Sequence, residues 1–239
     1  AHPDVVAAVQ DASLLLGQES LVEAYVSRGA RVSGVRACEG PPPFLLLGIE
    51  HLSDGPLKLD PAELRFAVGA EVAHLRLGHA RLTAQSVWDK VFEEGPSFLA
   101  TLADFAPFIP VRGAALAKGL QLARLIPLGK GKPRAARGGD LAVAWGDLLV
   151  ACRVMQLTAD RAGLLLCGDL RAAVRGMLLT SPAGREVLGR AERHGLRWAL
   201  HRQDEDGEPV PTQIALRVAA LLAFWLSDEY PLLRDAVEA

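Results

Sequence analysis

The sequence is short of cysteine, and the few cysteines that it has form no recognisable pair. Cys38, Cys152 and Cys167 lie far apart, make no CxxC motif and leave an odd count. This pattern predicts free thiols, held as small apolar residues of the interior, rather than disulfides. We therefore expect the chain to reside in the cytoplasm or in another reducing compartment.

The sequence also lacks a charge excess and a long apolar run. Its 26 Lys and Arg against 28 Asp and Glu give a formal net charge of -2, which makes no electrostatic case for binding nucleic acid or an anionic membrane. The most apolar stretch, residues 214–226, is too short to span a bilayer and contains Arg217, so it predicts a buried helix. No secretory signal peptide opens the sequence. We expect a soluble protein without a nucleic-acid partner or a membrane span.

The composition, half apolar and 23% charged over 239 residues, is that of a globular protein. Apolar residues at helical spacing predict one helix over residues 4–16 and a second over residues 19–27. The period then changes, and the residues on either side of the three prolines at 41–43 predict two short strands. The second of these strands is expected at residues 44–49.

The remainder of the chain predicts helices separated by polar loops. Asp60 followed by Pro61 predicts a helix start, because Asp is a favoured N-cap and Pro a favoured first residue. Prolines and a Gly-Pro pair divide the region after residue 95 into short helices. Later helices are expected from Asp140 to about Leu166, from Asp169, from Pro182 and from Pro211. Loops are expected at residues 128–139, which are basic and glycine-rich, and at residues 201–211.

These elements predict an α+β fold, mostly α, with a small sheet. We expect one domain over residues 1–239, in which residues 1–30 form a helical extension and residues 31–239 form the core. Basic residues in the loop at 128–139 are expected to be a solvated surface feature.

The segment GAEVAHLRLGH, residues 69–79, is one residue short of a zinc site. In the motif HExxH, two histidines four residues apart on a helix hold one metal, and the glutamate between them deprotonates the bound water. Glu71 and His74 occupy the base and second-ligand positions, but Ala70 occupies the position of the first histidine. A methyl group cannot ligate a metal, so the sequence keeps the frame of the motif without its full ligand set.

Three separated segments together resemble the HtpX-like and CAAX-prenyl-protease-like gluzincin metallopeptidases. They are ELRFAVGAEVAHLRLGH at residues 63–79, MQLTADRAGLLLC at residues 155–167 and PTQIALRVAAL at residues 211–221. The segments follow the order found in that family, and the resemblance covers about residues 35–222. It implies a zincin-like metallopeptidase fold, in which a bundle of helices and a small sheet surround the HExxH-type helix.

The resemblance also implies that the zinc ligands are degenerate. The third ligand, a glutamate in the family, falls on Gln156, and the supporting aspartate falls on Asp160. Arg217 matches the arginine of the last segment, without the histidine that accompanies it in the family. Two of the three ligands are thus lost, and we expect no zinc, no other cofactor and no catalytic residue.

The remaining polar residues are expected to be vestigial. His74 is predicted to be a hydrogen-bonded histidine of the interior, and Glu71 to have a raised pKa or a partner such as Arg161. If a metal were bound after all, its ligands would be His74, Glu71 and Asp160.

We therefore hypothesise a pseudo-peptidase, a catalytically inactive domain that binds a protein or peptide segment and serves as a scaffold or a regulator. In the family, substrate lies extended between the HExxH helix and an edge strand, and an exposed edge can pair with an added strand without a metal. The predicted peptide-binding residues are Phe44, Leu45, Leu46, Leu47, Gly48 and Ile49.

Two alternatives remain open at this stage. One is an active zinc metalloendopeptidase with a non-standard ligand set. The other is a structural interaction domain, in which residues 1–30 contact a second copy of the chain or a neighbouring domain.

Overall fold

The computed structural model describes residues 2–28, 34–79, 138–195, 201–203, 209–211 and 213–238. Most of these residues are helical and a few form a small sheet, so the prediction of a mostly α, α+β fold is confirmed. The short helices predicted after residue 95 and most of the basic loop at residues 128–139 lie outside this set. The zincin-like fold stays a prediction.

The chain divides into two compact units. The first combines Ala1–Leu77 with Leu157–Ala239, and the second consists of Gly78–Gln156. The first unit holds the sheet and all but one of the motif positions, Gln156 being the exception. Whether residues 1–239 behave as a single domain stays a prediction, and the description below concerns the first unit.

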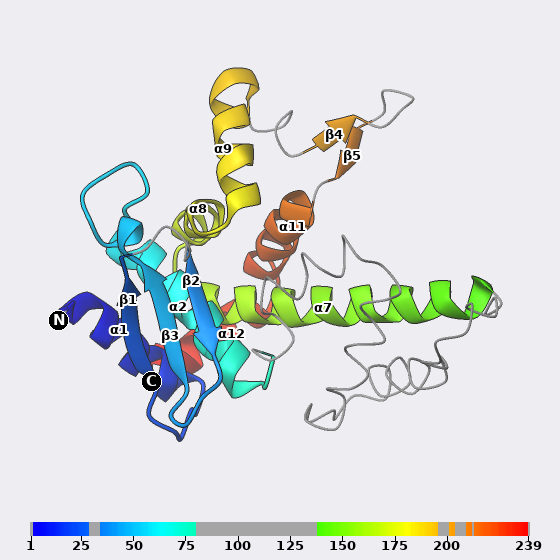
Figure 1. Ribbon diagram of the computed structural model, residues 1–239. Helices are drawn as coiled ribbons and strands as arrows, with labels where there is room; N and C mark the ends of the chain where they lie inside the picture. The colour runs from blue at the N-terminus through cyan, green and yellow to red at the C-terminus, as the bar shows by residue number, and fades with distance from the viewer. Residues whose placement is uncertain are drawn as a thin grey trace, which may run out of the picture. The chain divides into compact units, whose positions relative to one another are not determined.

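A three-stranded sheet forms from β1 (Glu23–Ser27), β2 (Val35–Cys38) and β3 (Phe44–Gly48), in the order β1-β3-β2 (Figure 1). Strand β3 runs parallel to β1 and antiparallel to β2. Its side chains Leu45 and Leu47 are fully buried, as alternation along a strand with one covered face requires.

The second N-terminal helix, predicted at residues 19–27, is wrong. Residues 23–27 form β1, in which Ala24 and Val26 pair with Leu45 and Leu47 of β3. Pairing along the whole of β3 outweighs the weak helical pattern of this short segment, since tertiary context overrides local propensity. Part of the predicted helical extension is therefore an integral strand of the sheet.

The prediction that residues 44–49 offer an exposed edge is also wrong. Strand β3 lies in the middle of the sheet, so its backbone is paired on both sides. Ile49 lies beyond the strand and begins a short 3-10 helix, η1 (Ile49–His51). Among the strands that the structure describes, β1 and β2 lie at the edges of the sheet.

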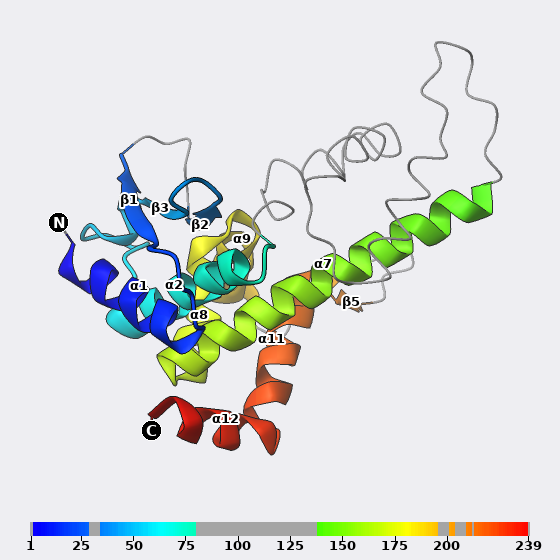
Figure 2. The same cartoon turned by 90° about the horizontal axis from the view of Figure 1, so that it is seen from below.

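Helices α1 (Pro3–Leu15) and α2 (Pro61–Arg76) lie on one face of this sheet (Figure 2). The predicted start of α2 is confirmed. Asp60 Oδ1 accepts a hydrogen bond from the Glu63 backbone N–H at 2.8 Å, and Glu63 Oε2 accepts one from the Asp60 N–H at 2.9 Å. This capping box fixes the first turn of α2 and so the direction in which its motif residues point.

The other helices that the structure describes come after the long gap in the described residues. They are α7 (Gly138–Cys167), α8 (Leu170–Thr180), α9 (Pro182–His194), α11 (Gln213–Trp225) and α12 (Glu229–Glu238). The predicted helices from Asp140, Asp169, Pro182 and Pro211 are confirmed within a few residues. The loop predicted at residues 201–211 is wrong in part, because Arg202 pairs with Val210 across two short strands, β4 (His201–Gln203) and β5 (Pro209–Pro211).

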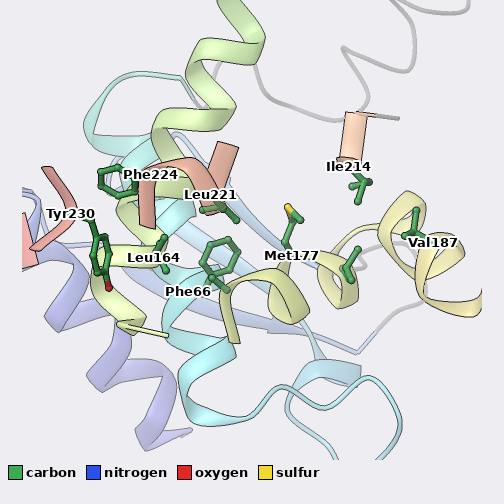
Figure 3. Packing of buried hydrophobic residues seen from close by; sticks show 10 residues of the cluster. Phe66, Leu164, Met177, Val187, Ile214, Leu221, Phe224 and Tyr230 are labelled. Atoms are coloured by element: carbon green, nitrogen blue, oxygen red, sulfur yellow. The ribbon is translucent and has the colours of Figure 1, made fainter. Parts of the chain in front are cut away.

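The main apolar core joins α2 to the C-terminal helices (Figure 3). Phe66 of α2 lies in the middle of this cluster, among Leu164 of α7, Met177 of α8 and Leu221 of α11. Each of these four side chains is at most 2% exposed. Helix α2 is therefore held rigidly, with the sheet on one side and this cluster on another.

No helix within the described ranges is both long enough and apolar enough to cross a membrane. The three cysteines carry free thiols, as predicted, and all three are half-buried. Burial raises the pKa of Cys152 to about 12 and that of Cys167 to about 11, so both stay protonated at neutral pH.

Candidate functional site

Helix α2 packs against α7 through small residues at the HExxH-like motif. A Cβ atom added to Gly163 of α7 would lie 2.6 Å from the backbone oxygen of Phe66, and one added to Gly69 would lie 3.2 Å from the Cα of Gly163. Both helices thus need glycine at their crossing, because any side chain there would push the two backbones apart. This close contact fixes the position of the AExxH turn.

Ala70, at the position of the first zinc-ligand histidine, is part of the packing between these helices. It forms a buried cluster with Ala73 of α2 and with Ala159 and Ala162 of α7, and it is 7% exposed. An imidazole at this position would have to displace well-packed neighbours. The small methyl group of Ala70 thus allows the two helices to pack closely at this position.

Glu71 is directed at the edge of the sheet. Its Oε2 accepts a hydrogen bond of 2.7 Å from the backbone N–H of Ala37, the third residue of β2. The bond joins the predicted vestigial base to an edge strand 34 residues earlier in the chain. The motif helix and the edge strand are thus in direct polar contact.

Asp160 and Arg217 form a bidentate ion pair between α7 and α11. Arg217 Nε donates to Asp160 Oδ2 at 2.8 Å, and its Nη2 donates to Oδ1 at 2.6 Å. The Asp160 side chain is 1% exposed and that of Arg217 is 21% exposed. Such a geometry is the strongest form of a protein ion pair, and it engages both oxygens of the carboxylate.

The charges of this ion pair reach Glu71. Burial raises the pKa of Glu71 from 4.5 to about 7, against the hydrogen bond from Ala37 and the positive charge of Arg217, which both lower it. Burial lowers the pKa of Arg217, but the charge and hydrogen bonds of Asp160 and the charge of Glu71 together outweigh it, so the pKa of Arg217 is raised. Glu71, Asp160 and Arg217 therefore form one electrostatic network.

Arg161, the predicted partner of Glu71, lies elsewhere. Its guanidinium is 5.0 Å from the centroid of the Phe224 ring, in a cation-π contact. Arg161 follows Asp160 directly on α7, so the two side chains leave the helix in different directions. The cations that act on Glu71 are Arg217 and Arg36.

The other two motif positions are His74 and Gln156. His74 is 2% exposed, so the prediction that it is an interior histidine is confirmed. Gln156 is half-buried on α7, one turn before Asp160, and it belongs to the second compact unit. Of the predicted site residues, the structure brings Glu71 and Asp160 into one network.

The residues of this network do not fit zinc. Ala70 contributes a packed methyl group, both oxygens of Asp160 accept from Arg217, and Glu71 accepts from Ala37. In the part of the chain that the structure describes, no three side chains of His, Cys, Asp or Glu converge closely enough to hold a metal ion. A catalytic zinc needs three protein ligands, and these residues offer no such set.

Two participants were not predicted from the sequence. The role of Arg217 could have been inferred, because a buried aspartate requires a nearby cation and Arg217 lies on an otherwise apolar segment. The part played by Ala37 has no signal in the sequence, because it depends on a backbone N–H and not on a side chain.

Comparison of the chain with family models, with curated proteins and with solved structures finds no match. The resemblance to the gluzincin metallopeptidases therefore rests on the three motif segments alone.

Proposed function

We propose that this chain is a non-catalytic, gluzincin-like domain that binds an extended protein segment along the outer edge of β2. The supporting observation is the hydrogen bond between Glu71 and Ala37, which brings the motif helix against an edge strand. In this proposal β2 takes the role first expected for residues 44–49.

The pairing of β2 with β3 supports a backbone-mediated mode of binding. Gly48 N–H donates to Gly34 O at 2.9 Å, just before β2. In an antiparallel pair, hydrogen-bonded and non-bonded pairs alternate, so the backbone N–H and C=O groups of Val35 and Ala37 point away from β3. An added strand would hydrogen-bond to these two residues, as in other cases of strand addition to a sheet edge.

The absence of catalysis in this proposal rests on the chemistry of the donor groups. A peptidase of the resembled family would need Asp160 to support a metal site, and here Asp160 neutralises Arg217. It would need Glu71 to abstract a proton from water, and here Glu71 accepts a hydrogen bond from a backbone amide. Both groups stabilise the fold. An active zinc peptidase would require the contacts of Asp160 with Arg217 and of Glu71 with Ala37 to be broken.

The proposal is tested by metal analysis and peptide cleavage on the purified protein. The protein is incubated with excess zinc and dialysed, its zinc content is measured, and cleavage of a peptide library is followed by mass spectrometry. We expect less than stoichiometric zinc and no cleavage. Near-stoichiometric zinc together with cleavage that Glu71→Gln abolishes would refute the proposal and establish the active peptidase.

The binding arm of the test uses a library of blocked, fluorescently labelled octapeptides and fluorescence anisotropy. Ala37→Pro removes the backbone donor of β2 at a position where proline is tolerated, because this N–H points out of the sheet edge. We expect this variant to bind the library more weakly than the wild type. Equal binding by the two proteins would place the peptide elsewhere and contradict the proposed use of β2.

A further inference from the structure

Glu71 occupies the backbone donor that an added strand would need. Its Oε2 lies 2.7 Å from the nitrogen of Ala37, and this N–H is one of the two on β2 that point away from β3. A backbone N–H provides a single hydrogen, so it cannot serve Glu71 and an incoming carbonyl at full strength together. The carboxylate and a bound peptide therefore compete for the same atom.

We infer that Glu71 is a guard of the β2 edge: it covers Ala37 in the resting protein and must leave for an extended peptide to bind. This inference rests on the proposed function, since it concerns the regulation of the same edge. Glu71, at the position of the catalytic base in the resembled family, would then determine how tightly an added strand binds to β2.

Charged neighbours and burial act in opposite directions on the ionisation of Glu71. The charge of Arg217 favours the ionised form of the Glu71 carboxyl, and so does the charge of Arg36 on β2. Burial and the nearby charge of Asp160 act against it. These opposing effects act on the charge of the carboxyl group, and the contact that an incoming peptide must displace is the 2.7 Å hydrogen bond from the Ala37 N–H to Glu71.

The covering of one donor also protects the edge. An open strand edge is a template for pairing with any other strand, and proteins commonly block such edges with charged side chains. Val35 presents the other outward N–H of β2 and is itself 7% exposed. An added strand would use both outward N–H groups of β2, and Glu71 covers the one at Ala37.

The test compares Glu71→Ala, which frees the Ala37 N–H, with Glu71→Gln, which retains a neutral acceptor of the same shape. The probe is the library of blocked octapeptides, and binding is measured by fluorescence anisotropy on the full chain. We expect Glu71→Ala to bind about ten-fold more tightly than the wild type, the effect of one hydrogen bond no longer in competition. Glu71→Gln should fall between the two.

Glu186→Ala on the exposed surface of α9 is the matched control and should bind as the wild type does. Circular dichroism and thermal unfolding confirm that each variant is folded. The double variant Glu71→Ala with Ala37→Pro should lose the gain, because the released donor is then absent.

Several results would overturn the inference. If Glu71→Ala binds no more tightly than the wild type while Ala37→Pro still weakens binding, the guard is refuted and the proposed function stands. If no variant binds the library, both fall together. A Glu71→Ala protein that self-associates in light scattering and takes up no peptide also refutes the guard, because Glu71 then only prevents pairing between copies.

Discussion

Arg217 on α11 binds both carboxylate oxygens of Asp160 on α7, and the two residues stand 57 positions apart in the chain. The pair lies between helices that also share the main apolar core through Leu164 and Leu221. One ionic contact thus ties the predicted second motif of the chain to the predicted third.

Replacing Arg217 with Met should lower the free energy of unfolding by about 3 kcal/mol, because it leaves a buried carboxylate without its cation. Urea unfolding at neutral pH measures the change. The double variant Asp160→Asn with Arg217→Met should lose less than the sum of the two single variants, since it leaves no uncompensated charge. Arg171→Met on the exposed face of α8 is the control, with an expected change below about 0.5 kcal/mol; an equally small change for Arg217→Met would contradict the role of the pair.

Glu71 should make stability fall as the pH rises. In the unfolded chain its carboxyl releases its proton near the ordinary value of 4.5, whereas in the folded protein it holds the proton up to about pH 7. Between these values the folded state binds more protons than the unfolded state, so the contribution of Glu71 is fully present below pH 4.5 and is lost as the pH rises to 7. The loss is at most about 3 kcal/mol.

Glu71→Gln isolates this effect from all other titrating groups. Urea unfolding of both proteins at several pH values between 5 and 8 gives the difference in their free energies of unfolding. We expect the wild type to lose stability relative to Glu71→Gln up to about pH 7 and the difference to level off above it. A difference that is flat, or that rises with pH, would show that the pKa of Glu71 is not raised.

Gly163→Ala should destabilise the protein by about 1–3 kcal/mol, because the new methyl group would lie 2.6 Å from the backbone oxygen of Phe66. Gly189→Ala on α9 is the matched control, since no atom lies within 4 Å of a Cβ at that position. It should stabilise the helix by about 0.5–1 kcal/mol, the usual gain of alanine over glycine. Thermal unfolding of the two variants should therefore show shifts of opposite sign, and shifts of the same sign would contradict the close crossing of α2 and α7.

Restoring the first histidine should damage the fold without restoring a metal site. Ala70→His places an imidazole into the packed alanine cluster and should cost about 1–3 kcal/mol. Ala183→His on the exposed first turn of α9 should cost less than about 0.5 kcal/mol. Elemental analysis of the Ala70→His protein after incubation with zinc should find no stoichiometric metal; one zinc per chain would show that a single ligand was all that the site lacked.

Deletion of residues 1–29 should abolish cooperative unfolding. It removes α1, which packs on α2 through buried residues such as Val9 and Ala12, and β1, which pairs with the whole of β3. Circular dichroism during urea unfolding would detect the loss. A shortened protein that stays folded and changes only from dimer to monomer would instead support the alternative in which these residues form a contact surface.

The sequence predicted the elements whose signals are local. Asp60 and Asp169 marked helix starts because capping depends on a few neighbouring residues, and Phe44 to Gly48 was recognised as a strand from its composition. The same sequence did not predict that this strand is central, because strand order depends on which segment joins from outside. Residues 23–27 joined it, and nothing in their own pattern indicated a parallel partner 21 residues later.

The candidate site shows the same division. The resemblance to the gluzincin family implied that Glu71 and Asp160 belong together, and the structure links them through Arg217. It did not predict the contact with Ala37, because backbone donors carry no residue identity. The packing of Ala70 was not predicted either. Ala70 fills a helix crossing because it contacts alanines of α7, which lie about 90 residues later in the sequence.

The long separation between Asp160 and Arg217 has a consequence for how the protein is made. During synthesis the ribosome releases α7 well before α11. For a time the nascent chain therefore carries the anionic side chain of Asp160 without the cation that neutralises it in the folded interior. The apolar core cannot close around it until the last helices have emerged. Premature termination before Arg217 should therefore yield a chain that chaperones retain and proteases remove.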